Sequence, residues 1–260
     1  MTEVSGAEVI DSTASRPLSG KRALVIGGSR GIGAAIVRRL AADGAAVGFT
    51  YHSSPEEAGH LASEATASGS TVAAIRADSG DVDAVASAVS ETVARFGGLD
   101  VLVNNAGVAH GAPIESFPLQ EFDRMVAINV RGVFAAIQAA VPHLHAGGRI
   151  INIGSVNADR VPVAGISIYS MTKAALAGLT RGLARELGPR GITVNNIQPG
   201  PTATDMNPDE GEFADHMRSL TALGRYGQPG DIASAVAYLA LPEAGFVTGT
   251  SWNIDGGYTL

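Results

Sequence analysis

The 260-residue chain has no cysteine, so it can form no disulfide bond, thiolate nucleophile or thiolate metal site. It has few basic residues for its size: 18 Lys and Arg stand against 25 Asp and Glu, for a net charge of -7. No Lys/Arg run is present, which argues against a nucleic-acid polymer as partner. Apolar runs are broken by glycine or charge well below the length of about 18 residues that indicates a membrane span. We therefore expect a cytoplasmic protein without a membrane partner.

The first residues also lack the basic start and apolar centre of a secretory signal. We expect residues 1–18 to form a flexible N-terminal arm and residues 19–260 to form one domain. A hydrophobic content of 45% and 33 glycines suit a compact domain with many tight turns. No metal site is predicted, because neither His143 and His145 nor the acidic stretch 205–209 has a metal-binding spacing.

Short apolar runs alternate with longer segments of helical period, the pattern of repeated βαβ units. The pattern predicts an α/β fold of the Rossmann type: a doubly wound, mainly parallel seven-stranded sheet with helices on both faces, in three layers. Residues 204–224 show no regular period and are interpreted as a substrate lid. A helix is expected at Ala34–Ala42, and strands are expected at Ala23–Ile26, Ala46–Tyr51, Thr71–Ala77, Leu99–Asn104, Arg149–Gly154, Ile192–Ile197 and Ser251–Ile254.

A glycine-rich turn follows the first strand and opens the first helix, where backbone N–H groups and the helix dipole can face a pyrophosphate. The end of the second strand carries no acid that could accept a hydrogen bond from a ribose 2′-hydroxyl. Arg30 in the turn can instead contact a 2′-phosphate, so the predicted cofactor is NADPH or NADP+ rather than NADH. The predicted contacts here are Gly27, Ser29, Arg30, Gly31, Ile32 and Gly33 in the turn, and Tyr51, His52 and Ser53 after the second strand.

Tyr169 and Lys173 are four positions apart, so on a helix they project from one face. A hydride that reaches a ketone carbon leaves an alkoxide, and an acid must then protonate the oxygen. We predict that Tyr169 is this acid. Lys173 is expected to lower the pKa of the phenol from its ordinary value near 10 by favouring the phenolate.

With these motifs the chain resembles the short-chain dehydrogenase/reductase family from Leu18 to Leu260. The resemblance implies a homotetramer and a catalytic group of Asn129, Ser155, Tyr169 and Lys173. In the family, Ser155 would hold the carbonyl oxygen, Lys173 would also hold the nicotinamide ribose, and Asn129 would hold a water beside Lys173. The resemblance further implies cofactor contacts by Asp78, Ser79, Asn105, Ala106, Gly107, Pro199, Gly200, Thr202 and Thr204.

The sequence favours one function and leaves two others open. The favoured one is NADPH-dependent reduction of a small free ketone or aldehyde. A resemblance to bacterial 3-oxoacyl-carrier-protein reductases gives the second, but Arg190 matches one of two docking arginines and Ala146 stands at the other. The third is cyclic-di-GMP binding, because residues 154–165 resemble a biofilm-dispersal subgroup in which Arg160 would contact phosphate. The intact catalytic group favours an enzyme over this binding protein.

Overall fold

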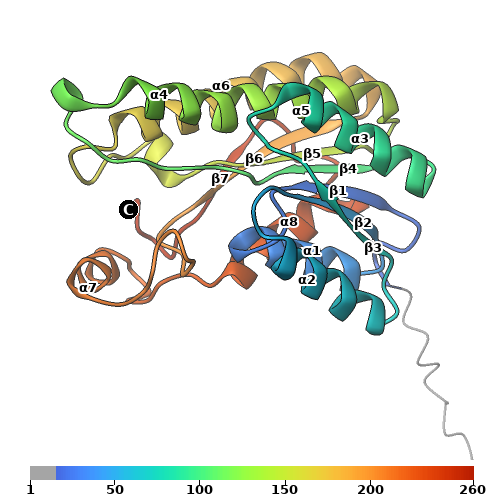
Figure 1. The fold of residues 1–260 in the computed structure, drawn as a ribbon, viewed down its shortest axis with the longest axis horizontal. Coiled ribbons are helices and arrows are strands. Elements are labelled where there is room, and N and C mark those ends of the chain that lie inside the picture. Colours follow the sequence, from blue (N-terminus) through green and yellow to red (C-terminus); the bar gives the residue numbers. More distant parts are fainter. Residues whose placement is uncertain (1–15) are drawn as a thin grey trace, which may run out of the picture.

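The computed structural model describes residues 16–260. A seven-stranded sheet in the order β3-β2-β1-β4-β5-β6-β7 lies at its centre, with helices on both faces (Figure 1). Each neighbouring pair is parallel. The predicted three-layer, doubly wound fold is thus confirmed. The strands are β1 (Arg22–Ile26), β2 (Ala46–Tyr51), β3 (Val72–Arg76), β4 (Val101–Asn104), β5 (Arg149–Ile153), β6 (Thr193–Pro199) and β7 (Ser251–Ile254).

Helices α1, α2 and α8 cover one face of the sheet, and α3, α5 and α6 cover the other (Figure 1). Helix α4 continues into α5 through a π-helical segment at Ala127–Gly132, and α7 stands beyond the carboxyl ends of the strands. The bounds are α1 (Gly31–Ala42), α2 (Pro55–Ala67), α3 (Val82–Phe96), α4 (Leu119–Val126), α5 (Val133–Ala140), α6 (Ser167–Leu187), α7 (Glu212–Ser219) and α8 (Pro229–Ala240).

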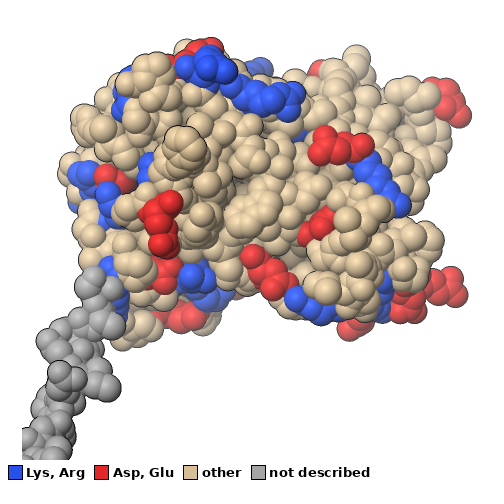
Figure 2. Space-filling model, turned by 180° about the vertical axis from the view of Figure 1, so that it is seen from behind, with Lys and Arg blue, Asp and Glu red and all other residues tan. Residues whose placement is uncertain are grey.

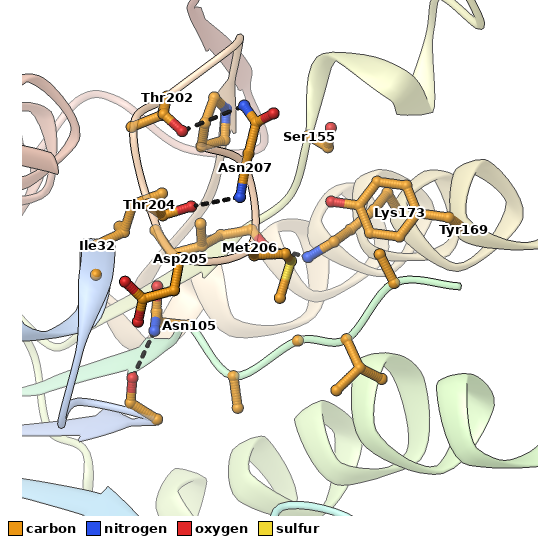
Figure 3. Close-up of a pocket in the computed structure, with 18 of the residues that line it drawn as sticks. Ile32, Asn105, Ser155, Tyr169, Lys173, Thr202, Thr204, Asp205, Met206 and Asn207 are labelled. Atoms are coloured by element: carbon orange, nitrogen blue, oxygen red, sulfur yellow. Dashed lines mark hydrogen bonds between the residues drawn. The ribbon is translucent and has the colours of Figure 1, made fainter. Parts of the chain in front are cut away.

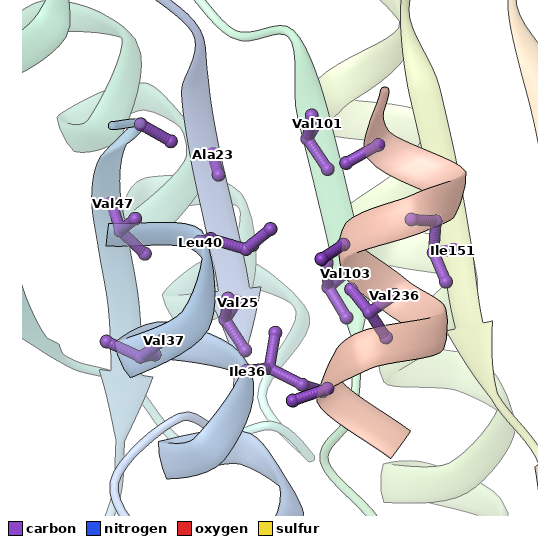
Figure 4. Packing of buried hydrophobic residues seen from close by; sticks show 14 of the residues in the cluster. Ala23, Val25, Ile36, Val37, Leu40, Val47, Val101, Val103, Ile151 and Val236 are labelled. Carbon is purple, nitrogen blue, oxygen red and sulfur yellow. The ribbon is translucent and has the colours of Figure 1, made fainter. Parts of the chain in front are cut away.

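Strand alternation divides the core into two apolar layers. Ala23 and Val25 of β1 face α1 and α8, whereas Leu24 belongs to the cluster under α3, α5 and α6. Helix α1 places Ile36 and Leu40 one turn apart against the sheet, where both are fully buried (Figure 4). Because both faces are covered, the strands carry continuous apolar runs, and every residue of β5 is buried.

Three sequence predictions need correction. Helix α1 begins at Gly31 rather than Ala34, because the last residues of the glycine turn already form its first turn. The lid is not irregular throughout, since α7 lies within it. Leu18, assigned to the arm, is fully buried and its N–H donates to the Asp43 carbonyl at 2.8 Å. The rest of the predicted arm, residues 1–15, lies outside the described residues.

One helical run, Leu119–His143, is long and apolar enough to cross a membrane by length and composition. Arg131 and Gly132 interrupt this run, so its uninterrupted apolar stretches stay short. Its apolar residues are accounted for by packing, because Val133, Ala136 and Ile137 are buried in the core layer beneath α3 and α6.

Candidate active site

A cavity of about 600 Å³ opens at the carboxyl ends of the strands. The strand order reverses direction between β1 and β4, and the chain leaves these two neighbours toward opposite faces of the sheet. In doubly wound sheets this divergence makes a crevice that binds ligands. Here the cavity runs continuously from the glycine turn after β1 to Tyr169 on α6.

The glycine turn is built to hold a phosphate group. Gly27 has φ +78°, and a Cβ there would lie 2.8 Å from the Cα of Ala106, so backbone passes close to backbone. The Gly27 carbonyl accepts a hydrogen bond from the Asn105 amide at 2.6 Å, which fixes the turn. The N-cap residue of α1, Arg30, makes no side-chain cap, and the first turn of the helix carries no acid. The free N–H groups and positive dipole of this helix end therefore fit an anionic pyrophosphate.

The far end of the cavity carries the residues predicted to meet the ribose and adenine. Tyr51, the last residue of β2, lines it together with His52 and Ser53. His52 Nδ1 lies 3.8 Å from the Asp78 carboxylate. The Arg30 side chain is 61% exposed, and its guanidinium lies 3.4 Å from the Asp205 carboxylate of the lid. Arg30 is thus near the surface, where it can reach a phosphate on the cofactor ribose.

The four residues of the predicted catalytic group lie together at the other end. Helix α6 buries the face that carries Lys173, Leu176 and Thr180, and Tyr169 precedes Lys173 by one turn (Figure 3). The Lys173 ammonium donates to the Ile153 carbonyl at 2.9 Å and lies 5.7 Å from the centre of the Tyr169 ring.

Ser155 and Asn129 complete the group from other elements. Ser155 follows β5, and its hydroxyl oxygen accepts the N–H of Asn157 at 3.1 Å, so its hydroxyl hydrogen can donate to the Tyr169 oxygen or to a substrate oxygen. Asn129 lies in the π-helical segment, a conformation often found at functional sites. The side-chain Oδ1 of Asn129 accepts a hydrogen bond from the N–H of Val108 at 2.8 Å. Its Nδ2 donates to the Val108 carbonyl at 2.8 Å and to the Thr172 hydroxyl at 3.1 Å. A Cβ on Gly107 would lie 3.2 Å from Lys173 Nζ and 3.6 Å from Asn129 Oδ1, so these two groups flank Gly107.

The protonation of the pair differs from the sequence prediction. Burial raises the pKa of the Tyr169 phenol, and hydrogen bonding with Ser155 opposes this shift by a smaller amount. Burial also lowers the pKa of Lys173 to about 8. The expected lowering of the phenol pKa is therefore wrong for this structure, because desolvation is the largest cause of its shift. The phenol keeps its proton near neutral pH, the form that an acid needs.

The cavity brings together nearly all the predicted site residues. Gly33 and Asn129 do not line the cavity, but both contact residues that do. Gly33 packs closely against Gly27, and Asn129 is hydrogen-bonded to Val108. The predicted residues that line it are Gly27, Ser29, Arg30, Gly31, Ile32, Tyr51, His52, Ser53, Asp78, Ser79, Asn105, Ala106, Gly107, Ser155, Tyr169, Lys173, Pro199, Gly200, Thr202 and Thr204.

Sequence reasoning predicted the lid as a segment but did not identify the individual residues that form the wall on the Tyr169 side. These residues come from the lid, from the loop after β4 and from the last residues of the chain, and no local pattern joins them. Within residues 16–260, no group of three or more His, Asp or Glu side chains is placed to hold a metal ion. The additional lining residues on this side include Ala109, His110, Met206, Asn207, Phe213, Met217 and Tyr258.

Two arginines considered for other functions do not line the cavity. Arg190 donates to the carbonyls of Val141 and Leu144 at 2.9 and 3.0 Å. Arg160 donates to the Tyr258 carbonyl, and its guanidinium lies over the Tyr258 ring at 5.2 Å. Both guanidinium groups are therefore engaged within the chain.

A family model described as enoyl-(acyl carrier protein) reductase matches residues 26–259. A relative from Escherichia coli K12, named cyclic-di-GMP-binding biofilm dispersal mediator protein, is 48% identical over 92% of this chain and 98% of its own length. The chain belongs to the short-chain dehydrogenase/reductase family of oxidoreductases. The 3-oxoacyl-[acyl-carrier-protein] reductase FabG of Staphylococcus aureus is 41% identical over 91% of this chain and 97% of its own.

Solved structures of this short-chain dehydrogenase/reductase family superimpose closely on the chain. One from Serratia marcescens has a TM-score of 0.93 and 58% identity, and it covers 94% of this chain and 100% of its own. A short-chain dehydrogenase from Burkholderia cenocepacia, in complex with NADP, has a TM-score of 0.92 and 52% identity with the same coverage. The predicted family and fold are confirmed.

Proposed function

We propose that this short-chain dehydrogenase/reductase is an NADP(H)-dependent carbonyl reductase that converts a small free ketone or aldehyde to the alcohol. One observation carries the proposal: a single cavity joins the uncapped start of α1 to the half-buried Tyr169. Solved relatives in complex with NADPH or NADP support the choice of cofactor. The test is steady-state NADPH oxidation with a panel of ketones and aldehydes, run beside NADH and beside titration with cyclic-di-GMP.

Bound at the glycine turn, the nicotinamide cofactor supplies a hydride for the carbonyl carbon. Ser155 donates its hydroxyl hydrogen to the carbonyl oxygen and fixes its position. Tyr169 then gives its proton to that oxygen as negative charge develops there, and it recovers a proton from solvent. Lys173 stabilises the transient phenolate, and Asn129 braces the loop that carries Gly107 beside the Lys173 amine.

The two pKa shifts set an expected pH dependence. At neutral pH Tyr169 is protonated and Lys173 is charged, so reduction proceeds at its full rate. As pH rises through the Lys173 pKa of about 8, the amine loses the charge that stabilises the phenolate. We expect kcat/KM for ketone reduction to fall above this pH. Initial rates of ketone reduction across the pH range test this, and a reduction rate that climbs with pH would contradict it.

Arg30 is proposed to select NADPH through its charge. The Arg30→Gln variant is expected to raise KM for NADPH about tenfold, equivalent to about 1.4 kcal/mol, and to leave KM for NADH unchanged. Arg38→Gln is the matched control, because Arg38 is a half-exposed arginine of α1 that pairs with Glu64. Steady-state kinetics with both cofactors provide the measurement. An equal loss with NADPH and NADH would exclude recognition of the 2′-phosphate.

Carrier-bound acyl chains are the less favoured substrate. An acidic carrier protein needs basic residues at the cavity mouth. Arg190 is committed to main-chain carbonyls, and the lid contributes Asp205 to the cavity. Figure 2 shows acidic and basic side chains interspersed on one face, without a broad basic patch.

Cyclic-di-GMP binding through Arg160 is also disfavoured, since this guanidinium holds the C-terminal wall of the cavity. The Arg160→Ala variant is expected to raise KM for the ketone three- to tenfold by loosening Tyr258, with kcat and NADPH affinity little changed. Arg160→Lys, which keeps a cation over the ring, should recover part of the loss. Kinetics with varied ketone and varied NADPH separate these effects. No turnover with any carbonyl, together with tight cyclic-di-GMP binding lost in Arg160→Ala, would reverse the assignment.

We also propose a cytoplasmic homotetramer. Phe134 on α5 and Met171 on α6 are 50% and 44% exposed on the outer side of their helix layer. Exposed large apolar side chains on such a layer are consistent with a surface that another subunit covers.

A further inference from the structure

Three segments form the substrate half of the cavity: the loop after β5, the lid and the C-terminal tail. These segments are residues 156–166, residues 205–217 and Tyr258. Apart from the Tyr258 hydroxyl, they bring three polar side chains to the cavity: Asn157, Asp205 and Asn207. The apolar or aromatic ones are Val156, Pro162, Val163, Ile166, Met206, Phe213, Met217 and Tyr258. The wall that faces the substituents of a bound carbonyl compound is therefore predominantly apolar.

The same segments offer no cation to a charged substrate among the described residues. Arg160 is turned to the Tyr258 carbonyl, and Arg218 of α7 pairs with Asp215 outside the cavity. Lys173 lies behind the phenol, with its ammonium bonded to the Ile153 carbonyl. Two further basic residues line the cavity from outside these segments: Arg124 of α4 pairs with Glu121 at 3.2 Å, and His110 packs edge-on against Phe117. A carboxylate or phosphate on the substrate would lose its hydration, and Asp205 would repel it.

The lid carries exposed apolar side chains at the cavity. Met206 is 55% exposed and Phe213 is 56% exposed, although both line the cavity. Beneath them Met217 and Tyr258 are buried, which gives this wall a fixed base. Figure 3 shows Met206 directed from the lid loop toward Lys173 and Tyr169. An apolar ligand at Tyr169 would remove Met206 and Phe213 from water, and this burial favours binding.

We propose that the substrate is a neutral, apolar ketone with an aryl or branched alkyl substituent, and that Met206 and Phe213 of the lid select it. This inference rests on the proposed carbonyl reductase activity and names its substrate class. Phe213 offers an aromatic face to the substituent, and Met206 adapts to its shape. Both are specificity residues, whereas Tyr169 and Ser155 act on the carbonyl oxygen of any substrate.

A matched pair of substrates tests the charge requirement. Acetophenone and 4-acetylbenzoate carry the same aryl methyl ketone and differ by one carboxylate. With NADPH, wild-type kcat/KM is expected to favour acetophenone by at least 100-fold. The Met206→Lys variant, which places a cation in the lid, should shift this ratio toward 4-acetylbenzoate by at least tenfold.

A second variant tests the apolar contact. Phe213→Ala is expected to raise KM for acetophenone about tenfold and to leave kcat/KM for the small ketone butanone within twofold. Phe246→Ala is the control, because Phe246 is fully exposed and does not line the cavity.

Calorimetric binding of both aryl ketones to NADP+-loaded Tyr169→Phe protein gives a readout that does not depend on turnover, and acetophenone should bind more tightly.

The results of these experiments distinguish a wrong substrate class from a wrong carbonyl reductase activity. Reduction of 4-acetylbenzoate as fast as acetophenone, or equal calorimetric affinity for the two, would overturn the substrate class and leave the reductase activity standing. Unchanged kinetics in Phe213→Ala would overturn the assignment of Phe213. Absence of NADPH oxidation with every carbonyl compound would overturn the proposed function and this inference with it.

Discussion

Replacement of Tyr169 by phenylalanine is expected to lower kcat for ketone reduction by about 1000-fold, because the variant lacks the proton that the new alkoxide needs. The phenol lines the cavity, and its raised pKa keeps it protonated at neutral pH. Phenylalanine keeps the ring and its packing and removes the hydroxyl alone. Rates of NADPH oxidation with saturating ketone provide the measurement.

Tyr238→Phe is the matched control, since Tyr238 is a partly exposed tyrosine of α8 that packs edge-on to Trp252 away from the cavity. This control should reduce ketones at the wild-type rate. NADPH affinity of Tyr169→Phe, measured by fluorescence titration, should stay within a few-fold of wild type. Near-normal turnover in Tyr169→Phe would remove the phenol from the mechanism.

A single methyl group at Gly33 is expected to abolish the cofactor site. A Cβ at this position would lie 2.1 Å from the Gly27 carbonyl oxygen and 2.6 Å from the Asn105 amide. The glycine turn would have to move, and its N–H groups would no longer point toward the pyrophosphate. We expect Gly33→Ala to weaken NADPH binding at least 100-fold and to lower the free energy of unfolding by about 2–4 kcal/mol.

The control for this substitution is Gly59→Ala on the exposed side of α2, where a Cβ would meet nothing within 4 Å. In a helix interior alanine is favoured over glycine, so this variant should gain about 0.5–1 kcal/mol. Denaturant unfolding and cofactor titration of both variants provide the comparison. Wild-type NADPH affinity in Gly33→Ala would show that the turn tolerates a side chain and does not hold the phosphate as described.

The parts of the site that were predicted correctly are those encoded by short segments. The glycine turn lies between a strand and a helix that adjoin it in sequence, and Tyr169 and Lys173 share one turn of α6. Strands with two buried faces also carry continuous apolar runs, which is why the sheet could be predicted from the sequence. Ser155 and Asn129 lie far from Tyr169 in the chain and were reached through family resemblance.

The parts that were missed depend on tertiary contacts. Phe213 and Tyr258 meet at the cavity because the lid folds over the C-terminal tail, and neither segment carries a sign of the other. The pKa of Tyr169 was assigned the wrong direction because desolvation, the largest cause of its shift, cannot be read from a four-residue spacing. The ion pair between Arg30 and Asp205 joins residues 175 positions apart.

The central claim is that the chain transfers a hydride and a proton to a free carbonyl group. Its most direct test is the amount of alcohol formed by the wild-type protein from acetophenone and a limiting amount of NADPH. The account predicts one molecule of 1-phenylethanol for each NADPH consumed. Tight NADPH binding without alcohol formation, from acetophenone or from any other ketone or aldehyde of the panel, would contradict it.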